Sequence, residues 1–537
     1  MKLIIKTILI SLLICTAVSG RVQSFGIFSP VYGMREDIPS ITIPEAFTHD
    51  NENVVLRYGE IHRCRMRTEP NSVTVATDGN PVLKYHYFEQ ADSTDYLVAF
   101  TKAHAYHWNS VSLEWDLKYT CSEDCTTWST VTFNDVLYAT NNIDKVQEWS
   151  GTGSFSDLGS ASGIDVGTTE YLTKATFLCT YEGYLMAGNV TVDGGAQPTT
   201  IFWSDTQDAD TWNSGNASYI TLPGPDSLKA TGKVMDFLLV FSGRSIDQLW
   251  ATDSSLIFNA RRLRNNMGTF SPDSIINGPQ GELYFMDNRQ NIRQVISTAA
   301  DMQVISRPID DTAKKIPYSL VSDVRGWWVD SLEQLWWSVP YGPGATENNK
   351  LICMDINGAW TKRDMAVSAF GEYEEKTTYT WASVPATATW ENWGKIWDSL
   401  EAMADYRLDI CGDYSGYTYN SHHSSQDNGA DFTGYAVVGS DLSHGKGTPI
   451  ADRYKRLVYM TLLFRNEGSG EADIYLKRDF ENEWNSLGSV SLEGDTDILW
   501  QRLNADYRGR YFQLKISADD PFRFIGVIFY YTVENLR

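Results

Sequence analysis

The sequence has little cysteine, a deficit of positive charge and few long apolar runs. Its 537 residues include seven cysteines, and 44 Lys and Arg stand against 68 Asp and Glu, so the net charge is −24. No block of Lys or Arg stands out. An acidic chain repels phosphate, which argues against a wrapped, charge-neutralising nucleic-acid site. It is compatible with an acidic wall along which DNA slides without sticking.

The long apolar run is at the N-terminus, in "MKLIIKTILISLLICTAVSG". Lys2 and Lys6 form a positive start, residues 8–15 are apolar and residues 17–19 are small, so residues 1–20 are predicted to be a secretory signal. The run is too short for an ordinary membrane-spanning helix. No other long apolar segment follows, and the rest of the chain is predicted to be soluble.

Six cysteines remain after Cys15, an even number that permits disulfides after export. The close pair is Cys121 and Cys125, in "CSEDCTTW". A CxxxC spacing without a second pair nearby argues against zinc. A local disulfide and two buried thiols remain as alternatives.

Motifs of the common enzyme classes are also missing. The sequence has no HExxH, no GxSxG and no dinucleotide-binding fingerprint. Paired carboxylates could serve a glycosidase, but 68 acidic residues give many chance pairs and nothing singles out one of them. We therefore predict a protein that is not an enzyme, with no catalytic residue and no cofactor.

A short turn followed by an apolar burst recurs through the middle of the chain, as in "TDYLVAF" (94–100) and "EGYLMAG" (182–188). A second, alternating segment often follows, such as "AYHW" (105–108). Each pair is typical of a β-hairpin, because alternation with period two marks a strand. The bursts share leucines that lie 40, 48, 53, 45 and 52 residues apart, namely Leu97, Leu137, Leu185, Leu238, Leu283 and Leu335.

This repeat predicts the fold class. A period of about 40 to 50 residues built from short strands is the mark of a β-propeller, and an aromatic content of 13% favours strands. We predict an all-β fold, with a β-propeller of about six to eight blades, an N-terminal arm and a C-terminal β-sandwich-like module. The expected division is a signal-like segment at 1–20, the arm at 21–80, the propeller at 81–430 and the C-terminal module at 431–537.

Two details are expected near the end of the predicted propeller. Residues 391–404 allow one short helix, and "DICGDYSGYTYN" (409–420) predicts a further hairpin.

Three aspartates, Asp205, Asp208 and Asp210, lie between Trp203 and Trp212 in "IFWSDTQDADTW". The loop follows the predicted strand "TTIFW", where a hairpin turn belongs, and Asp at a turn hydrogen-bonds its own backbone. We therefore interpret the loop as a turn. Three carboxylates could also begin a calcium site, which needs six or more oxygen ligands, so these residues are the candidate metal ligands.

Histidines that could form a metal site are His422, His423 and His444, with Asp427 and Asp431 nearby. Adjacent residues of a strand point to opposite faces, so the adjacent pair of histidines is poorly placed to bind one ion. The segment 421–434 is polar and rich in serine. It is predicted to be an exposed loop.

Tryptophan pairs occur in "GWWVD" (326–330) and "LWWSV" (335–339). On a strand, one member of each pair would face the core and the other a groove or a neighbouring blade. Core packing is the favoured interpretation, and glycan binding is the alternative.

The stretch at 25–70 does not fit the repeat and carries a pattern of its own. Its elements are a glycine, a Pro-x-x-x-Ile-Pro segment, an asparagine and a valine that begin a strand, a glycine and a basic run. The matching residues are Gly33, Pro39, Ile43, Pro44, Asn53, Val54, Gly59, Arg63, Arg65 and Arg67. Together with stretches at 201–212, 224–250, 268–295 and 507–531, this order resembles a family of tailed-bacteriophage virion proteins, the tail hub or nozzle type with a β-propeller.

The resemblance implies a structural protein of the virion tail without catalytic residues. Its expected partners are other tail proteins and further copies of itself in a ring, through which DNA passes during ejection without specific binding. The arm would lie across an adjacent subunit. The alternative, supported by the signal segment and the tryptophan pairs, is a secreted or periplasmic β-propeller that binds or hydrolyses glycans; a surface adhesion or scaffold module without chemistry is a third possibility.

Overall fold

Antiparallel strands dominate the protein. The computed structural model describes residues 22–68, 79–110, 112–252, 257–296, 301–375, 406–443 and 452–534. The predicted signal segment (1–20), the predicted helix (391–404) and His444 lie outside these ranges. The helices within them are short, and none could cross a membrane: η1 (Ser40–Thr42), η2 (Pro272–Ser274), η3 (Arg307–Ile309), α2 (Asp310–Ala313), η4 (Tyr318–Asp323) and η5 (Asp330–Leu332). The predicted all-β class is confirmed.

Between residues 82 and 420 the described strands form seven consecutive sheets, in each of which neighbouring strands follow one another along the chain. The first four sheets are β5 (Val82–Glu89), β6 (Asp95–Thr101), β7 (His104–Asn109) and β8 (Glu114–Thr120); β9 (Ser129–Phe133), β10 (Val136–Thr140), β11 (Gln147–Trp149) and β12 (Ser156–Asp157); β13 (Ile164–Gly167), β14 (Glu170–Tyr181), β15 (Tyr184–Val192), β16 (Gly195–Trp203) and β17 (Ser218–Thr221); and β18 (Leu228–Val234), β19 (Phe237–Ser242), β20 (Ser245–Ala251) and β21 (Phe258–Asn265). The next three are β22 (Ile276–Asn277), β23 (Leu283–Met286), β24 (Ile292–Val295) and β25 (Met302–Val304); β26 (Arg325–Val329), β27 (Gln334–Val339), β28 (Lys350–Asp355) and β29 (Trp360–Arg363); and β30 (Ala369–Glu375), β31 (Tyr406–Gly412) and β32 (Thr418–Asn420).

The repeated leucines all lie in strands at the middle of these sheets. They fall in β6, β10, β15, β19, β23 and β27, and each is buried. The alternating segments that follow them form β7, β11, β20, β24 and β28, each paired antiparallel with the leucine strand. The predicted hairpins, including the one at 409–420, are therefore confirmed.

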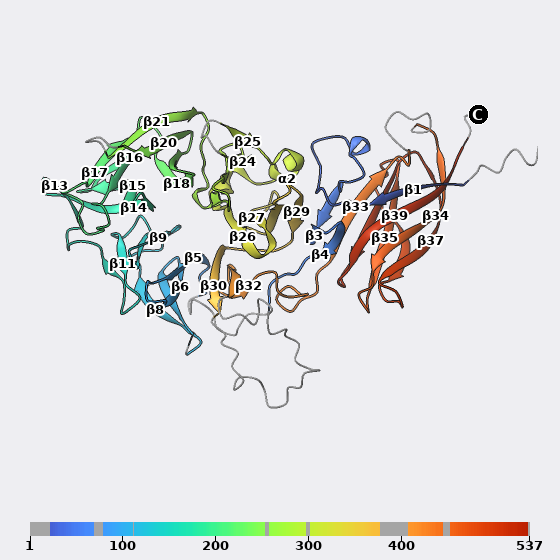
Figure 1. Ribbon diagram of the computed structural model, residues 1–537, viewed down its shortest axis with the longest axis horizontal. Coiled ribbons are helices and arrows are strands. Elements are labelled where there is room, and N and C mark those ends of the chain that lie inside the picture. The colour runs from blue at the N-terminus through green and yellow to red at the C-terminus, as the bar shows by residue number, and fades with distance from the viewer. Residues whose placement is uncertain are drawn as a thin grey trace, which may run out of the picture.

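The seven sheets are arranged so that one strand of each lies beside its counterpart in the next. The contacts run from β5 to β9, β14, β18, β22, β26 and β30, and β30 contacts β5 again. Figure 1 shows these sheets following one another in chain order, from blue to orange, on one side of the molecule.

Aromatic side chains fill the spaces between adjacent sheets. On β27, Trp336 and Trp337 point to opposite faces, and both are fully buried. The ring of Trp336 lies 6.3 Å from that of Phe370 on β30, whereas Trp337 stacks on Trp360 at 6.0 Å. This pair packs in the core and presents no free ring to a ligand.

Two further sheets at the other end of the molecule share one hydrophobic core (Figure 1). One has the order β3-β4-β39-β34-β37, with β1 also on β39, and the other has the order β2-β33-β38-β35-β36. Their strands are β1 (Gln23–Phe28), β2 (Asp50–Glu52), β3 (Val54–Arg57), β4 (Glu60–Arg63), β33 (Gly434–Ser440), β34 (Lys455–Arg465), β35 (Glu471–Arg478), β36 (Asn485–Ser491), β37 (Ile498–Gly509), β38 (Phe512–Ala518) and β39 (Arg523–Val533).

The four strands β1 to β4 of the arm predicted at 21–80, which was expected to lie across an adjacent subunit, belong to these two C-terminal sheets of their own chain. β1 pairs with β39 from Gln23–Tyr531 to Phe28–Gly526, and β2 pairs with β33. The strands β1 to β4 have only three to six residues each. Such short strands leave too little alternation to be recognised in the sequence.

Candidate functional site

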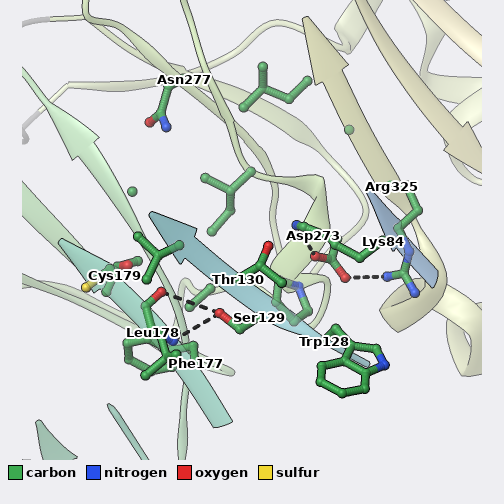
Figure 2. Close-up of a pocket in the computed structure, with 18 of the residues that line it drawn as sticks. Lys84, Trp128, Ser129, Thr130, Phe177, Leu178, Cys179, Asp273, Asn277 and Arg325 are labelled. Atoms are coloured by element: carbon green, nitrogen blue, oxygen red, sulfur yellow. Dashed lines mark hydrogen bonds and ion pairs between the residues drawn. The ribbon is translucent and has the colours of Figure 1, made fainter. Parts of the chain in front are cut away.

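A cavity of about 600 Å³ lies where one strand of each of the seven sheets converges with the others. It is lined from β5, β9, β14, β18, β22, β26 and β30, so every one of the seven sheets contributes. This volume is in the range of small-molecule pockets. Figure 2 shows 18 of the residues that line it.

An ion cluster joins β5, β26 and the short helix η2, which precedes β22, at one side of the cavity. Asp273 receives Lys84 Nζ on one carboxylate oxygen at 3.2 Å and Arg325 Nη1 on the other at 2.6 Å (Figure 2). Burial works to raise the pKa of Asp273, but the positive charges of Arg325 and Lys84 outweigh it and hold this pKa below its usual value. The carboxylate is therefore ionised and serves as the bridge between two cations.

Hydroxyl groups bridge the next pair of sheets. His86 on β5 has Nδ1 at 3.0 Å from Thr130 Oγ1 and Nε2 at 2.7 Å from Thr132 Oγ1, both on β9. Burial, with help from the charge of Lys84, lowers the pKa of His86 to about 3, so the ring is neutral. A neutral imidazole donates through one nitrogen and accepts through the other, which matches two hydroxyl partners.

Glycine permits the close approach of neighbouring sheets around the cavity. A Cβ built on Gly326 of β26 would lie 2.8 Å from the carbonyl oxygen of Ser274 and 2.7 Å from Ile276 of β22. Any larger residue would push these two sheets apart.

A serine, a histidine and an aspartate also meet, beside β26 and β31. Ser331 Oγ lies 2.9 Å from His422 Nε2 and donates to Asp409 Oδ2 at 3.1 Å, while Trp327 Nε1 donates to Asp409 Oδ1 at 3.1 Å. In a hydrolytic triad the carboxylate holds the ring nitrogen opposite the serine. Here Asp409 lies on the same Nε2 side, at 3.9 Å, and Nδ1 has no hydrogen-bond partner among the described residues.

The electrostatics of this cluster also argue against catalysis. Burial lowers the pKa of His422 to about 2 and raises that of Asp409 to about 6. A general base needs a pKa near the working pH, which His422 lacks. The cluster therefore holds two sheets together.

The prediction of an exposed loop at 421–434 was wrong at His422. Its side chain is buried and packs edge-on against Trp336, with the rings 5.8 Å apart. The chain around Met66 covers the segment, because Met66 N donates to the carbonyl oxygen of Ser424 at 2.8 Å. A contact across more than 350 residues cannot be read from local polarity.

The three aspartates of the calcium hypothesis serve their own loop. Asp205 Oδ1 accepts the backbone N–H of Thr206 at 2.8 Å and that of Asn216 at 2.9 Å. Asp208 Oδ1 accepts the N–H of Asp210 at 2.9 Å. These bonds are those of a turn, as the favoured interpretation expects. Within the described ranges, no group of three or more His, Cys, Asp or Glu side chains is placed to hold a metal ion.

The six cysteines within the described ranges are free thiols. Cys121 and Cys125 hydrogen-bond to each other, and this bond, with burial, raises the pKa of Cys121. Of the alternatives left open by the CxxxC spacing, a local disulfide or two buried thiols, the structure has two thiols, of which Cys125 is buried and Cys121 is half-buried.

The junction between the seven sheets and the C-terminal sheets is built on residues 50–54. β2 pairs with β33 on one side and contacts β29 on the other. Two ion pairs cross the junction, with Lys362 Nζ 2.7 Å from Asp50 Oδ1 and Lys350 Nζ 2.7 Å from Glu52 Oε2.

Asn53 is the central residue of this junction. It has a φ of +57° and is 4% exposed. Its Nδ2 donates to the carbonyl oxygen of Thr433 at 2.8 Å, and its Oδ1 accepts the N–H of Asp364 at 2.7 Å. Its own N–H donates to the carbonyl oxygen of Lys362 at 2.8 Å. One side chain thus bonds both parts of the molecule.

Other residues of the stretch at 25–70 also lie at this junction. Gly33 has a φ of +93°, and a Cβ there would lie 2.4 Å from the backbone nitrogen of Trp360. Arg67 makes a two-pronged ion pair with Asp427 at 2.8 Å and donates to the carbonyl oxygen of Ala366 at 3.0 Å. Residues of this stretch therefore have architectural roles.

Reasoning from the sequence did not select Lys84, Asp273 and Arg325. No local motif unites them, because Lys84 lies on β5, Asp273 on η2 and Arg325 on β26, far apart in the sequence. A weak signal was available in the repeat, since they precede Leu97, Leu283 and Leu335 by 13, 10 and 10 residues. Aligning the repeats on their leucines would have placed all three residues in, or just before, the strand that precedes the leucine strand.

Comparisons with known proteins identify no family for this chain. No protein-family model matches it, and neither does any curated protein. Among solved structures, the extracellular domain of a hybrid two-component system from B. thetaiotaomicron is similar, with 12% sequence identity and a TM-score of 0.39. The likeness covers 84% of this chain and 57% of that domain, so the chain spans little more than half of its length.

Proposed function

We propose that the protein is a structural component of a bacteriophage virion, of the tail hub or nozzle type. One observation carries this proposal. Gly33, Asn53 and Arg67, which belong to the stretch that resembles that family, all make contacts where the two all-β parts meet. Contacts that fix one part of the molecule to the other suit a structural protein of an assembly.

In this proposal the seven sheets form a β-propeller. The contacts that run from β5 through β9, β14, β18, β22, β26 and β30 and back to β5 support it. So do the buried leucines at the middle of the sheets, since blades of a propeller cover their faces by stacking on their neighbours.

The DNA conduit would be formed between copies of the chain. A cavity of about 600 Å³ has the size of a small-molecule pocket, so a duplex would not pass through the sheets of one copy. The net charge of −24 would keep DNA mobile along the walls of a ring. Self-assembly is supported by the outer face of the six-stranded sheet, where Phe28 is 52% exposed and Trp500 is 63% exposed.

The test is peptide mass spectrometry of purified particles from the source, including the N-terminal peptide. Peptides of this chain at stoichiometric level would support a virion component, and an intact Met1 peptide would exclude signal cleavage. Absence from particles, together with a processed N-terminus in the medium or periplasm, would overturn the proposal and favour the secreted alternative.

A further inference from the structure

The charges that line the central cavity have the opposite balance to the whole chain. The cavity is lined by four cationic side chains, Lys84, Lys229, Lys233 and Arg325, and by two carboxylates, Asp273 and Glu372. It therefore carries an excess of two positive charges, in a chain whose net charge is −24. The electrostatic potential in the cavity is therefore expected to be positive, although the chain as a whole is acidic.

Both carboxylates are already engaged. Asp273 is shared between Lys84 and Arg325, so this group keeps one positive charge. Glu372 Oε1 receives Arg407 Nη1 at 3.1 Å, from a side chain that does not line the cavity. Neither carboxylate is therefore left to neutralise the remaining lysines.

Those lysines are Lys229 and Lys233 on β18. They are four positions apart, and with Thr231 between them they are less buried than the other residues of this strand. All three line the cavity. Neither has an acidic partner within the described ranges of the chain. The next strand around the cavity, β22, adds the amide of Asn277 to the lining.

We propose that this cavity binds a small anion that carries several negatively charged oxygens, such as phosphate or carboxylate groups. Lys229 and Lys233 bind it from one side, and the cluster of Lys84 and Arg325 attracts it from the other. Amide and hydroxyl groups of the lining, including Asn277, add donors that fix its orientation. A charge pair in a cavity is stronger than one at an open surface, because less water screens it. The inference is independent of the proposed virion role.

The test is isothermal titration calorimetry of the full chain with inorganic tripolyphosphate, and separately with citrate. We expect binding of at least one of them. The double variant Lys229→Gln/Lys233→Gln should lose at least about tenfold in affinity, which corresponds to about 1.4 kcal/mol. The single variant Lys233→Gln should show an intermediate loss, because it removes one of the two charges. Tripolyphosphate binding without citrate binding would assign the phosphate class, and the reverse would assign carboxylates.

A matched control is Lys477→Gln, on β35 of the C-terminal sheets, which should bind as the unchanged chain does. Circular dichroism and thermal unfolding of each variant show whether the fold is retained. The proposal is overturned if neither anion binds at millimolar concentration. It is equally overturned if the folded lysine variants bind as tightly as the unchanged chain.

Discussion

Replacing Asn53 should weaken the junction by an amount that can be worked out from its contacts. The Asn53→Ala variant loses two side-chain hydrogen bonds, of 2.8 and 2.7 Å, and each is worth about 1 kcal/mol net. It also places alanine at a φ of +57°, where an asparagine is tolerated and alanine costs about 1 kcal/mol more. The expected loss of unfolding free energy is therefore about 3 kcal/mol.

Two further variants separate these contributions. Asn53→Gly removes the same bonds but accepts the positive φ, so it should cost about 1 kcal/mol less than the alanine variant. Asn142 has a similar φ of +61° and is exposed, and its side chain makes no hydrogen bond within the described residues. Asn142→Ala should therefore lose only about 1 kcal/mol.

Calorimetric unfolding of the full chain provides the measurement. For a unit of about 150 to 250 residues, 1 kcal/mol corresponds to about 2–4 °C in Tm, so Asn53→Ala should lower the affected transition by about 6–12 °C. Asn142 lies in the larger part of the chain, the seven sheets between residues 82 and 420, so Asn142→Ala should lower its transition by only about 1–2 °C. Equal losses of unfolding free energy for the two alanine variants would refute the reasoning. They would mean that the side-chain hydrogen bonds of Asn53 across the junction contribute no stability.

Three other expectations follow from the same contacts. The pKa of a histidine in the unfolded chain is near 6.5, whereas that of folded His86 is lowered to about 3. The neutral ring of His86 therefore stabilises the fold above about pH 6.5, and this stabilisation is lost as the pH falls. In calorimetry, lowering the pH from 7 to 5 should reduce the unfolding free energy of the unchanged chain by about 2 kcal/mol more than that of His86→Gln. Gly326→Ala should cost about 1–3 kcal/mol of unfolding free energy in urea titrations, whereas Gly344→Ala, where a Cβ meets nothing within 4 Å, should cost little. If the chain self-assembles as proposed, Trp500→Ser should weaken association about tenfold or more in analytical ultracentrifugation, and Tyr219→Ser, at an exposed aromatic outside that sheet, should not.

The repeat could be predicted because its signal is local. Each leucine burst and the strand after it lie within about 20 residues, and alternation inside that window reports the hairpin directly. Leu137 and Leu335 illustrate this, since both are buried in a strand that pairs with its successor. The C-terminal strands β34 and β39 were also readable, because 11 residues each give a clear alternation.

The junction and the cavity could not be predicted in the same way. Asn53 bonds to Asp364 and Thr433, which are more than 300 residues away, and no local pattern encodes such a partner. The partners in the cluster of Lys84, Asp273 and Arg325 are likewise distant in the sequence, since they come from β5, η2 and β26. Only the closing of the series of sheets brings these residues together.

The net charge describes the chain as a whole, and the cavity shows that a single site can have a local charge of the opposite sign. The net charge of −24 describes the average surface that a passing polyanion would meet. Four cationic side chains are instead gathered in the lining of the cavity: Lys84, Lys229, Lys233 and Arg325. A cavity with low-dielectric walls responds to its own lining more than to distant surface charge, which salt screens beyond about 8–10 Å. The acidity that would keep DNA mobile on the outside is therefore compatible with an anion site inside, and the two can be separated by salt: anion binding in the cavity should be less sensitive to ionic strength than any interaction at the outer surface.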